Sequence, residues 1–99
     1  MSLNNQQKKH YRSIGHDLSP VVTIAGNGLT ENVLKEINRA LDDHELIKIK
    51  VSITDREGRV AMINDICKRT RATEVQKIGK VALILREAKR PNAKLSNIR

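Results

Sequence analysis

The fold is decided by residues 21–37, VVTIAGNGLTENVLKEI. Residues 21–24 are all β-branched, follow Pro20 and are bounded by turn residues, which predicts a short buried strand. Thr30 suits the N-cap of a helix, and apolar residues recur at helical spacing across residues 31–43. The glycine-rich turn between them is expected to leave backbone N–H groups free beside the positive end of the helix. Such a turn is a candidate anion site.

The same turn has a purely structural interpretation. Strand-to-helix turns often need a residue with positive φ, which Gly and Asn supply at little cost. The charge of the chain favours a functional role, because 19 Lys and Arg against 11 Asp and Glu give a formal net charge of +8. Phosphates of nucleic acid are the commonest polyanion in a cell, so nucleic acid is the first partner to consider.

Downstream of the helix, residues 46–53 carry a clear pattern, in which the apolar residues 47, 49, 51 and 53 alternate strictly with polar residues. This predicts a half-buried strand with Lys48 and Lys50 on its non-core face, and the sequence does not decide whether that face is open or covered. Asp55 then suits the N-cap of a helix that reaches residue 70. Gly58 leaves a rival hairpin turn at residues 55–58, but the absence of alternation afterwards favours the helix.

The two ends of the chain complete the pattern. Residues 3–14 predict a short helix with Gly15 in a C′-like position. Its Lys8, Lys9 and Arg12 form either a basic binding side or an ordinary solvated face. Residues 75–78 and 81–85 predict a hairpin through Gly79-Lys80, and the second strand is apolar on both sides and therefore central.

The resulting order is α-β-α-β-α-β-β, which predicts one compact, two-layer α/β domain over residues 1–87 with a four-stranded mixed sheet. Residues 88–99 are basic and polar without periodicity, so we expect a flexible C-terminal tail unless a partner orders it.

Composition and motifs exclude several classes of function. The lone Cys67, the lack of an apolar leader and the lack of a long apolar run predict a reduced, cytoplasmic protein without membrane contact. The histidines are scattered, and the acidic cluster of residues 42–45 fits a solvated helix end better than a metal or acid–base site. We therefore expect no catalytic residues, metal or cofactor. Tyr11 is the only aromatic residue, which excludes RNA recognition by base stacking.

Three blocks of sequence resemble the CRM domain (chloroplast RNA splicing and ribosome maturation). They are AGNGLT with VLKEI in residues 25–37, HELIKIKV in residues 44–51 and VQKIGKVALILR in residues 75–86, in the expected order. The resemblance implies a fold similar to the C-terminal domain of translation initiation factor 3. It also implies RNA binding through a GxxG loop that clamps the nucleotide backbone. For stand-alone bacterial members it implies association with ribosomal RNA in precursors of the large subunit.

This chain departs from the family pattern at Ala25, where the first loop glycine would fall, and its loop lacks the lysine of many relatives. An alanine forced into the left-handed region costs about 1 kcal/mol, so either residue 25 keeps a negative φ or Gly26 absorbs the turn. The predicted RNA-binding residues are Gly26, Asn27, Gly28, Thr30, Lys8, Lys9, Arg12, Lys48, Lys50, Lys77 and Lys80. Two alternatives remain open, namely a duplex DNA binder and a module that docks on an acidic protein. The oligomeric state is undetermined.

Overall fold

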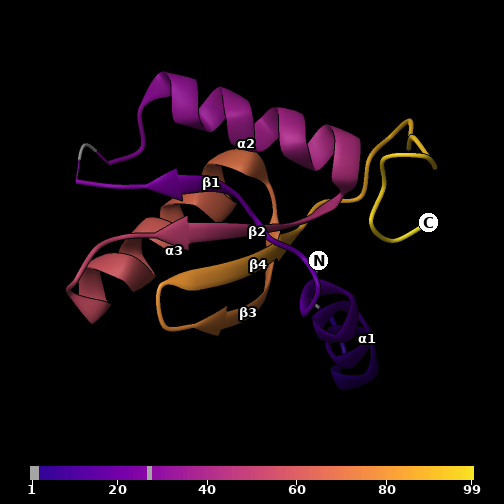
Figure 1. Ribbon diagram of the computed structural model, residues 1–99, viewed down its shortest axis with the longest axis horizontal. Helices are drawn as coiled ribbons and strands as arrows, with labels where there is room; N and C mark the ends of the chain where they lie inside the picture. The colour runs from indigo at the N-terminus through magenta and orange to yellow at the C-terminus, as the bar shows by residue number, and fades with distance from the viewer. Residues whose placement is uncertain (1–2, 27) are drawn as a thin grey trace.

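The computed structural model describes residues 3–26 and 28–99, so the predicted site residue Asn27 lies outside the described residues. The helices and strands follow in the predicted order (Figure 1). They are α1 (Asn5–Gly15), β1 (Pro20–Ile24), α2 (Glu31–His44), β2 (Leu46–Val51), α3 (Arg56–Thr70), β3 (Thr73–Ile78) and β4 (Val81–Leu85). Only boundaries differ, most at three places: α1 begins two residues later than predicted, β2 ends two residues earlier, and β3 begins two residues earlier.

The four strands form one mixed sheet in the order β1-β2-β4-β3. β1 and β2 are parallel, whereas β4 is antiparallel to both of its neighbours. The central place of β4 confirms the prediction from its two apolar faces. The parallel pair β1 and β2, with α2 between its strands, forms a βαβ unit.

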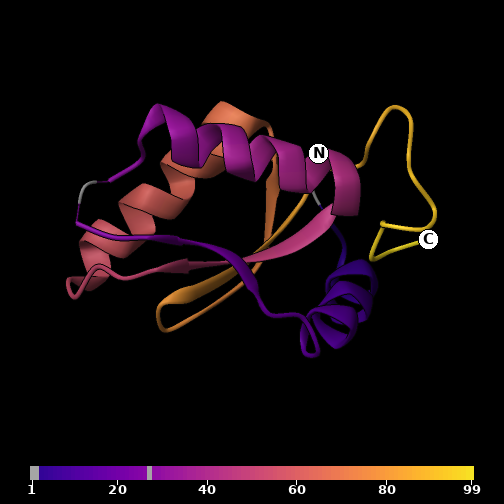
Figure 2. The ribbon, with the colours of Figure 1, turned by 45° about the horizontal axis from the view of Figure 1, so that its top comes forward.

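Helices cover both faces of the sheet unequally. α2 and α3 lie on one face, and α1 lies on the other (Figures 1 and 2). The larger apolar cluster fills the space under α2 and α3, and its fully buried members include Ile24, Ile37, Ile49, Ile63 and Ile84. A smaller cluster under α1 contains Leu46, Val75, Leu83 and Leu85, with Tyr11, Ile14 and Ile98 packed against it.

Both predicted N-caps are present. The N–H of Val33 donates to Oγ1 of Thr30 at 3.2 Å, and the N–H of Gly58 donates to Oδ2 of Asp55 at 2.7 Å. Each bond satisfies one amide that the first turn of the helix leaves without a partner. The rival interpretation of residues 55–58 as a hairpin turn is therefore wrong.

Gly15 has a different role from the predicted one. It is the buried last residue of α1, and the cap that follows, His16, has a right-handed conformation with φ −55°. A Cβ added at Gly15 would lie 2.5 Å from Cδ2 of Leu83. The glycine is therefore required by the close approach of α1 to β4, not by a left-handed helix end.

The C-terminal segment folds back against the end of α2 rather than leaving the domain (Figure 2). Its anchor is Glu45, which is completely buried and has φ 64°. The Glu45 carboxylate accepts hydrogen bonds from the backbone N–H of Ala88, the hydroxyl of Ser96 and the guanidinium of Arg99. This arrangement differs from the expected flexible tail and from the expected solvated cluster at residues 42–45. The C-terminal segment is ordered by hydrogen bonds to one buried carboxylate, and the pattern of apolar residues in the sequence does not predict such bonds.

Candidate nucleic-acid interface

Three connections meet at one end of the sheet, which we call the loop end (Figure 1). They are the glycine loop of residues 25–30 after β1, the segment of residues 52–55 after β2, and the turn between β3 and β4. Backbone hydrogen bonds join them: the N–H of Ser52 donates to the carbonyl of Ile24 at 2.8 Å, and the N–H of Val51 donates to the carbonyl of Lys80 at 2.6 Å. The parallel β1–β2 pair and the antiparallel β4 require this gathering.

The glycine loop is closed by its own hydrogen bonds. The N–H of Gly28 donates to the carbonyl of Ala25 at 2.9 Å, and the N–H of Thr30 donates to the carbonyl of Gly28 at 3.2 Å. The amide of Gly28 is thus engaged inside the turn, which corrects the expectation that it is free to hold a phosphate. The hydroxyl oxygen of Thr30 accepts the N–H of Val33 as the N-cap of α2, and its O–H group is still able to donate.

The conformation of the loop explains how Ala25 is tolerated. Gly28 carries the positive φ, 74°, and Ala25 is not among the described residues with positive φ. Replacing the family's first glycine with alanine therefore costs no backbone strain here. Ala25 and Gly26 are exposed, and a Cβ at Gly26 would meet no atom within 4 Å. Ala25 and Gly26 therefore offer a surface with little side-chain bulk that a polymer backbone can approach closely.

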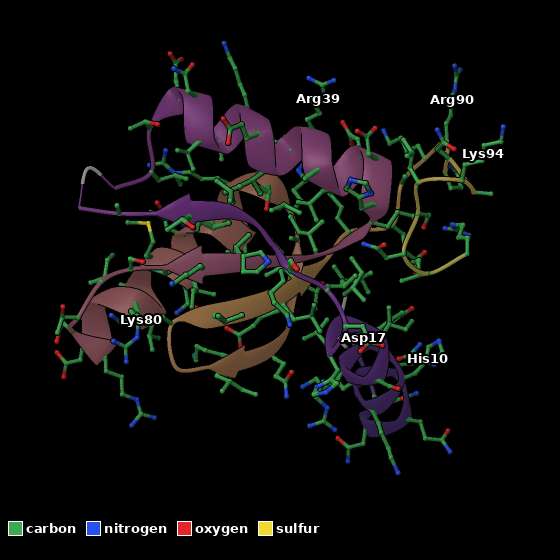
Figure 3. The ribbon with its side chains drawn as sticks, viewed as in Figure 1. His10, Asp17, Arg39, Lys80, Arg90 and Lys94 are labelled. Carbon is green, nitrogen blue, oxygen red and sulfur yellow. The ribbon has the colours of Figure 1, made fainter. Side chains whose placement is uncertain are left out.

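Cationic side chains surround the loop end. Lys50 is exposed on β2, Lys77 lies on β3, and Lys80 lies in the turn between β3 and β4 (Figure 3). The first turn of α3 adds Arg56 and Arg59, which the sequence analysis missed. The sequence could have predicted their position. A helix capped by Asp55 has its first turn just after the end of β2, and therefore at the same end of the sheet as the glycine loop.

Acidic side chains are also present at the loop end. Glu31 is in the first turn of α2, while Asp55 caps α3 and Glu57 follows in its first turn. All three are exposed. Glu74, which lies 3.7 Å from Lys77, brings the acidic side chains to four against the five cations just named, so the loop end keeps an excess of positive charge. That excess is modest, which makes the placement of individual cations important.

The remaining predicted cations lie on the α1 side of the sheet. Arg12 and Lys48 line a groove of about 460 Å³ that also includes His16, Gln76 and Ile78. This settles the open question about the lysine face of β2: Leu46 is buried, Lys48 is half-buried in the groove, and Lys50 is exposed.

Lys8 and Lys9 project from α1, which lies away from the glycine loop in both ribbon views (Figures 1 and 2). Lys9 is exposed and Lys8 is half-buried. The predicted residues therefore divide into a loop-end group and an α1-side group. Positive charge extends beyond both, because Arg39 projects from α2, and Arg90 and Lys94 project from the C-terminal segment (Figure 3).

Residues 3–26 and 28–99 contain no group of three or more His, Cys, Asp or Glu that could hold a metal ion. Cys67 is half-buried, and burial, aided by the charge of Glu74, raises its pKa to about 11. The thiol is therefore protonated at neutral pH and is a poor nucleophile. Among the described residues, no helix has the length and apolar character that a membrane crossing requires.

Comparison with known proteins places these features in context. The family model of the CRS1 / YhbY (CRM) domain matches residues 3–86. A protein of Pseudomonas aeruginosa named as a probable RNA-binding protein is 51% identical over 98 residues, which are 99% of this chain and 94% of that protein. A protein of Haemophilus influenzae named as an RNA-binding protein is 44% identical over 94 residues, 95% of each chain. The solution structure of a hypothetical Staphylococcus aureus protein has a TM-score of 0.78 at 32% identity, and the match covers 90% of this chain and 93% of that one.

Proposed function

This chain belongs to the CRS1 / YhbY (CRM) domain family, and from that membership we propose that it is a non-catalytic RNA-binding protein that holds the phosphate backbone of its ligand. The names of the relatives from P. aeruginosa and H. influenzae support RNA as the ligand. The observation that carries the proposal is the exposed glycine turn among the cations of the loop end. The net charge of +8 gives the whole chain a field that attracts polyanions.

The proposed mechanism relies on side-chain charge and close approach. Gly26 contributes little bulk to the loop, Gly28 supplies its turn with φ 74°, and Thr30 fixes the start of α2 as its N-cap. Lys50 and Lys80 neutralise phosphates next to the loop, and Lys77 adds positive charge at the β3 edge of the loop end. Base stacking has no part in the proposal, because Tyr11, the only aromatic residue, packs against the apolar cluster under α1.

The α1 side extends the track in the proposed complex. Arg12 and Lys48 flank one groove, and Lys8 and Lys9 continue the positive surface along the helix. Lys48 and Lys50 lie two residues apart on the same face of β2, so a ligand can pass from the loop end to the α1 side along that face. A ligand that also reaches Lys8 and Lys9 must be long, so a folded or long RNA fits better than a short oligonucleotide. The proposed target is ribosomal RNA in cytoplasmic precursors of the large subunit, as the resemblance to stand-alone bacterial members implies.

Competition binding tests RNA against the alternatives. Structured ribosomal RNA and duplex DNA of equal length are titrated against the purified protein at fixed salt, with fluorescence anisotropy as the readout. We expect tighter binding to RNA, whereas equal affinity supports the duplex DNA alternative. Ribonuclease treatment of a native pull-down tests the acidic protein partner, since co-purification that survives digestion favours it.

Sedimentation tests the proposed target. Cell extracts are separated on a sucrose gradient, and the protein is located by immunoblotting. We expect it with precursors of the large subunit and not with mature ribosomes. A protein that stays at the top of the gradient under low salt would contradict the ribosomal assignment while leaving RNA binding in place.

A further inference from the structure

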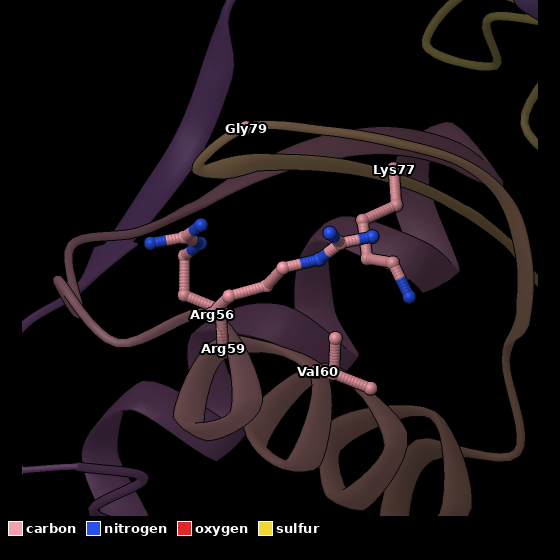
Figure 4. A pocket seen from close by; sticks show the side chains of 5 residues that line it. All are labelled: Arg56, Arg59, Val60, Lys77 and Gly79. Carbon is pink, nitrogen blue, oxygen red and sulfur yellow. The ribbon is translucent and has the colours of Figure 1, made fainter.

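A hollow of about 290 Å³ lies between the start of α3 and the hairpin of β3 and β4 (Figure 4). Its lining includes Arg56, Arg59 and Val60 from α3, and Lys77 and Gly79 from the hairpin. Among the described residues that line it, three are cationic and none is acidic. Glu74, outside the lining, offsets part of the charge of Lys77, and the remaining concentration of like charge is unfavourable unless an anion or solvent offsets it.

Arg59 is held in place by the protein itself. Its Nη1 donates to the carbonyl oxygens of Ile53 at 2.8 Å and Thr54 at 2.7 Å. Within the described residues it makes no other hydrogen bond, so the N–H groups on Nε and Nη2 remain for a ligand. A half-buried guanidinium fixed at one nitrogen loses little further freedom when it binds a second group.

Lys77 and Arg56 complete the lining from two directions. Figure 4 shows two arginine side chains that extend from the start of α3 into the hollow in different directions, one of them toward Lys77. The Lys77 ammonium lies 3.7 Å from Oε1 of Glu74, and about a third of each side chain is exposed. An ion pair of that length and exposure is weak, so it competes poorly with a phosphate for the ammonium.

We propose that this hollow binds a phosphate group of RNA as a contact separate from the glycine loop. The proposal rests on the proposed RNA-binding function. The planar fork of a guanidinium matches two oxygens of a phosphate, and a nearby ammonium adds a point charge. The glycine loop follows β1 and the hollow lies under β3, so about 14 Å, three strand spacings, separates the two edges.

The phosphate has two possible sources on an RNA. An internal phosphodiester carries one negative charge, whereas a phosphate at the end of a strand approaches two negative charges at neutral pH. Both present the same oxygens to the hollow. Oligonucleotides of one sequence with a 5′-phosphate or a 5′-hydroxyl distinguish them.

The test compares Arg59→Gln and Lys77→Gln with the control Arg39→Gln. Arg39 is exposed on α2, away from the hollow (Figure 3). Dissociation constants for both oligonucleotides are measured by anisotropy over a range of salt concentrations, and circular dichroism checks the fold. We expect each hollow variant to bind three- to tenfold more weakly and to lose about one unit of salt slope. The control should stay within about twofold of the parent.

Each outcome has a defined meaning. A 5′-phosphate that tightens binding to the parent but not to the variants assigns the hollow to a strand end, and equal losses for both oligonucleotides assign it to an internal phosphodiester. Because Arg59→Gln also removes two bonds to the segment before α3, Lys77→Gln decides the matter if Arg59→Gln unfolds. Parent-like affinity and salt slope in Lys77→Gln overturn the proposal.

Failure of the proposed function is distinguishable from failure of the hollow. A parent protein that does not bind RNA contradicts the proposed function. The hollow is then judged by titrating inorganic phosphate and following backbone amide shifts by NMR. Shifts confined to residues 56–60 and 77–79 that disappear in Lys77→Gln support an anion site, and unchanged spectra overturn it.

Discussion

Arg99 and Glu45, 54 residues apart, form a two-point ion pair: Nε of Arg99 lies 2.7 Å from Oε1 of Glu45, and Nη2 lies 2.9 Å from Oε2. The glutamate is completely buried. The hydrogen bond from Arg99 is the main cause that lowers the Glu45 pKa from 4.5 to about 2, against the opposing effect of burial. This pair joins the C-terminal segment to the end of α2.

Stability should therefore depend on pH through Glu45. A carboxyl group with a lowered pKa in the folded state stabilises the protein above its unfolded pKa, and the stabilisation is lost as pH falls through the folded pKa. We expect the urea concentration at the midpoint of unfolding to decrease as the pH is lowered from 4.5 to about 2. This decrease should be smaller in Glu45→Gln. Equal acid dependence in the parent and the variant would show that other carboxyl groups account for the loss.

Gly15→Ala should destabilise the protein by about 1–3 kcal/mol, because its Cβ would overlap the Leu83 side chain. Urea unfolding measures the change in free energy. Gly26→Ala is the matched control: its Cβ meets open space, so we expect a change within about 0.5 kcal/mol. The double variant Gly15→Ala with Leu83→Ala should lose less than the sum of the two single variants, and simple additivity would argue against a steric cause.

Local patterns predict much of this fold, because a strand, a helix and a cap depend on neighbouring residues. Thr30 and Asp55 are capping residues for that reason. Gly15 was misinterpreted because its constraint comes from Leu83, 68 residues further along the chain. Glu45 was misplaced for the same kind of reason, since its partners lie in the C-terminal segment.

In the candidate site, too, features formed by neighbouring residues are predictable from the sequence, and features formed by distant residues are not. The glycine loop is visible in the sequence because its residues are contiguous. The hollow formed by Arg56, Arg59 and Lys77 is not, because it exists only where α3 meets the hairpin. The split of the predicted cations into two groups also depends on α1 lying on the opposite face from α2 and α3 (Figure 2).

Gly26→Asp should weaken RNA binding about tenfold by placing a carboxylate on the surface of the loop. Position 26 suits this test better than Gly28, because Gly28 has φ 74° and any side chain there is strained. Gly26→Asn has nearly the same shape without the charge and should bind within about threefold of the parent. Anisotropy titrations at two salt concentrations measure both variants. Equal affinity of the Asp and Asn variants would remove the loop from the contact surface.

Replacing Lys8, Lys9 and Arg12 together with Gln tests whether the α1 side touches RNA. Each phosphate contact that is lost should lower the slope of log affinity against log salt by roughly one unit. Of these three residues, only Arg12 lines the groove that contains Lys48. If the groove holds the ligand, Arg12→Gln alone should lower the salt slope by about one unit. A triple variant with the parent's slope would restrict binding to the loop end. A triple variant that changes the slope while Arg12→Gln does not would place the contact on the outer surface of α1.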